Sequence, residues 1–149
     1  MGLMSILHEC EQLLAESASN NLRMKEVTRI AHLLRDAGIE LSYHNIADYG
    51  NLSDEQVEKV FLWNMSQKKN ARLDFNVGDQ VTSKGDYSKL LAAILYLQTH
   101  RKQGMTFLAQ KSGLSEERIK EIIAAHGKSI KKEFSGFNPL WTKGATASE

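Results

Sequence analysis

Five histidines and one cysteine, the side chains most typical of zinc sites, are spread along a chain of 149 residues. No histidine pairs with another histidine, a cysteine or an acidic residue at a spacing typical of a metal site. Cys10 is the single cysteine, so it can form no internal disulfide. The histidines are His8, His32, His44, His100 and His126.

Motifs for catalysis on phosphates or acyl groups are also missing from the sequence. The stretch "VGDQVTSKG" has too few glycines, and the wrong order of Ser, Lys and Gly, for a phosphate-binding loop. No nucleophile elbow surrounds any serine. We therefore expect no enzyme activity, no metal and no cofactor.

The composition is that of a folded soluble domain, with 42% hydrophobic and 25% charged residues. No apolar run approaches the roughly 18 residues that span a bilayer. The N-terminus lacks the charged, apolar and small-residue regions of an export signal. We expect a cytoplasmic protein with no membrane partner.

Basic side chains offer a second kind of chemistry, because Lys and Arg bind phosphates. Residues 1–85 hold nine Lys or Arg against twelve Asp or Glu, whereas residues 86–149 hold ten against six. This asymmetry favours a nucleic-acid partner for the second half, with ordinary solvated helix faces as the alternative. The basic residues around one helical motif of that half are Arg101, Lys102, Lys111, Lys128, Lys131 and Lys132.

Helical periodicity dominates the elements that must position these groups. Apolar residues recur at three- and four-residue steps near the N-terminus, over residues 23–37, and from Tyr87 to Leu97. Gly38 is a natural left-handed stop for the second of these helices. Ser42 is expected to cap a short helix, and Ser53 to cap another with Gln56 completing a capping box.

Two segments depart from this helical pattern. In residues 71–85 apolar side chains alternate at Leu73, Phe75 and Val77, and Val81 follows a Gly-Asp pair, which predicts a short β-hairpin. After a last short helix from about His126, the tail is expected to be extended. Its aromatic and apolar residues would cover the core or dock a partner. They are Phe134, Phe137, Leu140 and Trp141.

Two helical corners are related by an offset of 62 residues. "NIADYGNLSDEQVEKVF" begins at Asn45 and "FLAQKSGLSEERIKEII" begins at Phe107. In the second, the small side chain of Ala109 permits a close helix crossing, and Gly113 turns the chain. Leu114 then packs between the two helices, and Ser115 caps the second of them. The following apolar positions, Ile119 and Ile122, return to the core. In the first corner Asn51 replaces the glycine, and Asn tolerates the left-handed conformation.

The segment Phe107–Ile123 resembles the helix-turn-helix of bacterial transcription regulators. It departs from the family at Ser112, where an apolar side chain is usual. The matching positions are Leu108, Ala109, Gly113, Leu114, Ile119 and Ile122. The hairpin would suit the wing of a winged helix. The resemblance implies that exposed residues at the start of the second helix meet base edges while basic neighbours hold phosphates. Carried onto this sequence, the base-reading residues are Glu116, Glu117, Arg118 and Glu121. The DNA-binding set as a whole is then Lys111, Ser115, Glu117, Arg118, Lys120, Lys128, Lys131 and Lys132.

The expected fold is mainly α, with two helix-turn-helix-type three-helix units and a short β-hairpin between them. An N-terminal helix occupies residues 1–20, the first unit 21–85, the second unit 86–132 and the tail 133–149. We expect a small regulator of transcription, of bacterial, phage or plasmid type, that binds double-stranded DNA with the second unit, as a homodimer or with a protein partner. The alternative is a protein–protein interaction module, which the acidic residues of both corners favour.

Overall fold

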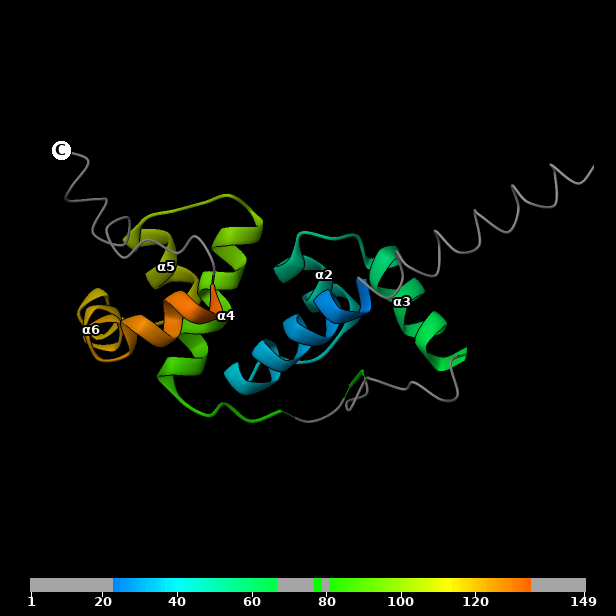
Figure 1. Cartoon of the computed structure of the whole chain (residues 1–149), viewed down its shortest axis with the longest axis horizontal. Coiled ribbons are helices and arrows are strands. Elements are labelled where there is room, and N and C mark those ends of the chain that lie inside the picture. Colours follow the sequence, from blue (N-terminus) through cyan, green and yellow to red (C-terminus); the bar gives the residue numbers. More distant parts are fainter. Residues whose placement is uncertain (1–22, 67–76, 79–80, 135–149) are drawn as a thin grey trace, which may run out of the picture.

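The computed structural model describes residues 23–66, 77–78 and 81–134, and every regular element within them is an α-helix (Figure 1). This confirms the prediction of a mainly α fold. The expected N-terminal helix, and the tail beyond Phe134, lie outside the described residues. A helical segment at 23–37 is followed by α2 (Tyr43–Gly50), α3 (Asp54–Ser66), α4 (Asp86–Thr99), α5 (Met105–Ser112) and α6 (Glu116–Glu133).

Polar side chains cap the helices of the first unit as their positions predict. The Ser42 hydroxyl accepts the backbone N–H of Asn45 at 3.0 Å, at the start of α2. At α3 the cap is reciprocal, because the Ser53 hydroxyl accepts the N–H of Gln56 at 3.1 Å and the Gln56 amide oxygen accepts the N–H of Ser53 at 2.9 Å. Each cap supplies a partner for a backbone donor that the first helical turn leaves unpaired.

One apolar core joins the helices of both units. Figure 1 shows segment 23–37, α2 and α3 on the right and α4, α5 and α6 on the left, and α2 contacts α4 where the two groups meet. The core side chains with no exposed surface come from every helix, and Leu41 adds one from the turn before α2. They include Val27, Leu34, Ile46, Val57, Leu90, Ile94, Leu108, Ile119 and Ile130.

The β-hairpin expected between the units is wrong, because no strand occurs in the part of the chain that the structure describes. Two backbone donors of this connection pair with the first unit, and a third, the N–H of Gly85, donates to the Ser83 hydroxyl at 3.1 Å. Gly78 donates its N–H to the carbonyl oxygen of Leu41 at 2.8 Å, and Lys84 donates to that of Asp36 at 2.8 Å. The connection thus donates to carbonyl groups at the end of segment 23–37 and in the turn that follows it, and no winged-helix wing is formed within the described residues.

Gly38 provides a test of this docking. Its φ is +79°, and a Cβ added there would lie 2.9 Å from the backbone nitrogen of Ser83. We expect Gly38→Ala to lower the free energy of unfolding by roughly 2–3 kcal/mol, from left-handed strain and the clash together. Gly113→Ala is the matched control, because φ is +72° there and nothing lies within 4 Å. Equal losses of unfolding free energy for the two variants, measured by urea denaturation, would show that Ser83 does not clash with a side chain at position 38.

Candidate nucleic-acid interface

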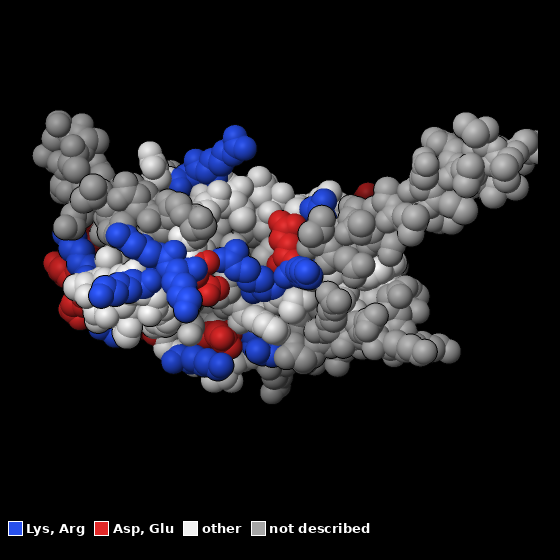
Figure 2. Space-filling model, viewed as in Figure 1, with Lys and Arg blue, Asp and Glu red and all other residues white. Residues whose placement is uncertain are grey.

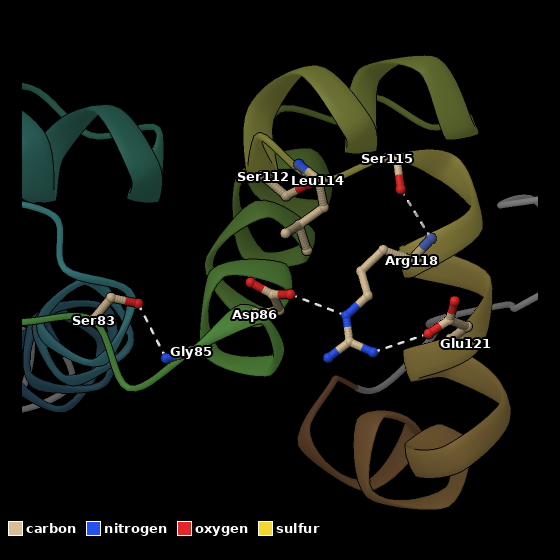
Figure 3. Close-up of polar contacts among 8 residues, drawn as sticks. All are labelled: Ser83, Gly85, Asp86, Ser112, Leu114, Ser115, Arg118 and Glu121. Atoms are coloured by element: carbon tan, nitrogen blue, oxygen red, sulfur yellow. Dashed lines mark hydrogen bonds and ion pairs between the residues drawn. The ribbon is translucent and has the colours of Figure 1, made fainter.

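The second corner has the geometry that its residues predict. Gly113 is left-handed (φ 72°, ψ 15°) and donates its N–H to the carbonyl oxygen of Ala109 at 2.9 Å. The Ser115 hydroxyl caps α6 by accepting the N–H of Arg118 at 3.1 Å (Figure 3). Ile119 and Ile122 are buried below this turn.

Ser112, the departure from the helix-turn-helix pattern, is buried without losing its hydrogen bonds. Its side chain is 9% exposed. Its hydroxyl accepts the N–H of Leu114 at 3.2 Å and donates to the carbonyl oxygen of Ala109 at 3.4 Å. A hydroxyl is tolerated inside this corner because the turn itself supplies both partners.

The first corner repeats this construction 62 residues earlier. Asn51, which aligns with Gly113 at this offset, has a left-handed backbone with φ 53° and ψ 48°. The helices that follow the two corners, α3 and α6, lie at opposite ends of the described structure (Figure 1). A duplex bound along one of these helices would therefore not also lie along the equivalent surface of the other helix.

Arg118 is engaged within the protein rather than free for a ligand. Its Nε lies 3.0 Å from Asp86 Oδ2 and its Nη1 lies 3.0 Å from Glu121 Oε2 (Figure 3). These hydrogen bonds, first from Asp86 and then from Glu121, raise the pKa of Arg118 above its ordinary value. A phosphate or base would have to displace two carboxylates to reach this guanidinium.

Lys111 points toward the first unit instead of outward. Its ammonium group lies 3.9 Å from the ring centre of Tyr96 and 4.6 Å from that of Tyr49, within the range of cation–π attraction. Its Nζ is also 3.8 Å from Asp48 Oδ2. Lys111 therefore joins α5 to α4 and α2, and it is poorly placed to hold a phosphate.

The C-terminal ends of α2 and α4 meet beside Lys111 and satisfy one another's carbonyl groups. Thr99 donates to the carbonyl oxygen of Tyr49, and the His100 ring nitrogen donates to that of Asp48, both at 2.6 Å. In return the Asn51 amide donates to the carbonyl oxygen of Thr99 at 3.2 Å. Because helix C-termini carry partial negative charge, the Lys111 cation also complements this junction. Burial, and then the charge of Asp48, raise the pKa of the Tyr49 phenol.

Lys111→Met tests this structural role. The substitution keeps an unbranched apolar stem but removes the charge, and we expect it to lower the free energy of unfolding by about 1 kcal/mol. A double-mutant cycle with Tyr96→Leu should give a coupling energy of about 0.5–1 kcal/mol, since the ammonium is closest to this ring. A cycle with no coupling would mean that the ring contact does not stabilise the protein.

The other basic residues of α6 are exposed and form no ion pair among the described residues. Lys120 lies on the first half of the helix, which also carries the exposed acidic residues Glu116, Glu117 and Glu121. The remaining three, Lys128, Lys131 and Lys132, follow a break in helical geometry at His126 (φ −126°, ψ 17°). The break confirms the expected separate short helix. The outer surface of α6 therefore changes from acidic at its start to basic after the break.

A groove beside the end of α6 is lined by residues that were not among the DNA-binding residues predicted from the sequence. It has a volume of about 540 Å³, and its lining includes Lys25, Arg29 and His32 from segment 23–37 and Glu133 from α6. The spacing of Lys25, Arg29 and His32 places them on one helix face. The sequence contains that spacing, but nothing in it indicates that the end of α6 lies opposite.

Comparisons with protein-family models, curated proteins and solved structures gave no match to this chain. Within the described ranges, no group of three or more His, Cys, Asp or Glu side chains is placed to hold a metal ion. None of the described helices is long and apolar enough to cross a bilayer.

Proposed function

We propose that the protein is a small regulator that binds double-stranded DNA, with α6 of the second corner against the phosphate backbone. One observation carries the proposal. The corner presents Lys128, Lys131 and Lys132 on the exposed second half of α6, and none of the three forms an ion pair with a carboxylate among the described residues. The helix-turn-helix resemblance of Phe107–Ile123 supports the same assignment, as does the basic second half of the chain.

The start of α6 is poorly suited to both base reading and phosphate contacts, so the proposal rests on the second half of this helix. Glu116 and Glu117 can accept a hydrogen bond from cytosine, but their charge repels phosphates. Arg118, the cation among the expected base readers, is occupied by Asp86 and Glu121. Regulation of transcription, a cytoplasmic location and a homodimer that matches a two-fold operator belong to this proposal.

The test is binding of a fluorescent DNA duplex at 50 and 200 mM salt, measured by anisotropy. Each Lys–phosphate contact contributes about −0.9 to the slope of log K against log salt. Exchanging Lys128, Lys131 and Lys132 for Gln should therefore make the slope shallower by about 2.7. The control exchanges three exposed basic residues elsewhere, Lys59, Arg101 and Lys102, and should retain most of the slope. If the native chain showed no salt-dependent binding at micromolar concentration, the proposed function would be wrong.

A protein–protein module is the second candidate, and α3 carries the observation that favours it. Leu62 and Met65 are 56% and 74% exposed on this helix. Asp54, Glu55 and Glu58 are exposed on the same helix, so a partner would be apolar and basic. Under this reading, exchanging Leu62 and Met65 for Gln abolishes partner binding. The same exchange leaves DNA affinity unchanged if α6 binds the duplex.

A further inference from the structure

The second half of α6 is clamped against the first unit. The Arg29 side chain donates through Nη2 to the carbonyl oxygen of Glu133 at 2.8 Å, and its Nε lies 3.7 Å from the Glu133 carboxylate. The same guanidinium stacks 5.0 Å from the ring centre of Phe134, which is 1% exposed. These contacts hold the C-terminal end of α6 against segment 23–37, a neighbour about a hundred residues earlier in the chain.

Around this groove, a positive charge remains unpaired while the negative charges are paired. Lys25 is exposed and forms no ion pair among the described residues, and Arg29 lies next to it on the same helix face. The two carboxylates of the groove are already partnered, Glu133 by Arg29 and Asp36 by Lys84 at 3.1 Å. The uncompensated charge at the groove and at the adjoining end of α6 is therefore positive.

Figure 2 shows that Lys and Arg side chains gather on the face that carries the second half of α6 and the start of segment 23–37. Potentials of like sign add where charged groups lie within about a Debye length of one another, roughly 10 Å at 0.1 M salt. The first half of α6 has the opposite character, with three exposed glutamates around Lys120. A polyanion is attracted to one half of α6 and repelled from the other.

We propose that the DNA-binding surface is composite, formed by the second half of α6 together with the Lys25–Arg29 face of segment 23–37. The inference rests on the proposed function, and it places the duplex backbone across the groove between the two units. The acidic start of α6, which the helix-turn-helix resemblance assigns to base reading, then lies off the duplex. Binding of this kind is dominated by phosphate contacts and depends weakly on base sequence.

The test compares three single exchanges of exposed, unpaired lysines in the full chain. Lys25→Gln lies on segment 23–37, Lys131→Gln on the second half of α6, and Lys120→Gln on its first half. The composite surface predicts that the first two each make the salt slope shallower by about 0.9 and weaken binding several-fold. Lys120→Gln should leave both quantities close to the native values. Thermal melting followed by circular dichroism checks that each variant is folded.

The outcomes separate this inference from the proposed function. Loss of affinity with Lys131→Gln but not with Lys25→Gln overturns the composite surface and leaves DNA binding by α6 intact. Loss with Lys120→Gln alone overturns it in favour of the start of α6. Absence of duplex binding by the native chain, with or without binding to vesicles of anionic phosphatidylglycerol, overturns both.

Discussion

Phe134→Ala is expected to lower the free energy of unfolding by about 3–5 kcal/mol, the usual cost of emptying a buried aromatic site. The ring is 1% exposed at the end of α6, and the Arg29 guanidinium covers it at 5.0 Å. Removing the ring creates a cavity and also withdraws the surface on which Arg29 packs. We therefore expect weaker DNA binding as well, because the end of the helix that carries the α6 lysines is no longer held against segment 23–37. Urea denaturation and duplex binding on the same samples measure the two effects.

Phe134→Leu is the control for the position, since it retains most of the buried volume and should cost much less. Binding is compared at a temperature at which the alanine variant is still folded. A loss of stability below about 1 kcal/mol for Phe134→Ala would contradict the role of this ring as the anchor of α6.

Leu108→Ala and Ile46→Ala form a matched pair, because the two positions are equivalent in the two corners and neither side chain is exposed. Each exchange should cost about 2–5 kcal/mol. Both residues belong to one core cluster, and α4 contacts both α2, which carries Ile46, and α5, which carries Leu108. We therefore expect each variant to unfold in a single transition at a lower urea concentration, with near-ultraviolet and far-ultraviolet signals changing together.

The opposite result would be two resolved transitions, with Leu108→Ala shifting one and Ile46→Ala shifting the other. That behaviour would mean that the first and second units are independently stable. It would also mean that the contacts around Lys111 contribute little coupling between them.

The helix caps and the left-handed turn were predictable from the sequence, because the residues that form each of them are only a few positions apart. The Ser53–Gln56 capping box, the Ser115 cap and the left-handed Gly113 follow from spacings of three residues or fewer. Buried positions such as Ile119 and Ile122 follow from helical period in the same way.

Contacts between distant segments were not predictable in this way. Lys111 was expected to hold phosphate, yet its neighbours Tyr49 and Asp48 lie about sixty residues earlier. The alternating pattern around Val77 suggested a hairpin, but the backbone donors of Gly78 and Lys84 find acceptors at Leu41 and Asp36 of the first unit. Periodicity records which face of a segment is apolar, and it does not identify the segment that covers that face.

The salt dependence of duplex binding by the native chain tests the central claim most directly. Lys25 and the three lysines after the break in α6 together predict a slope of log K against log salt between about −3 and −4. Two duplexes of unrelated sequence should give similar slopes and affinities. A flat dependence on salt, or no binding to either duplex at micromolar protein, would contradict a DNA-binding face on this protein.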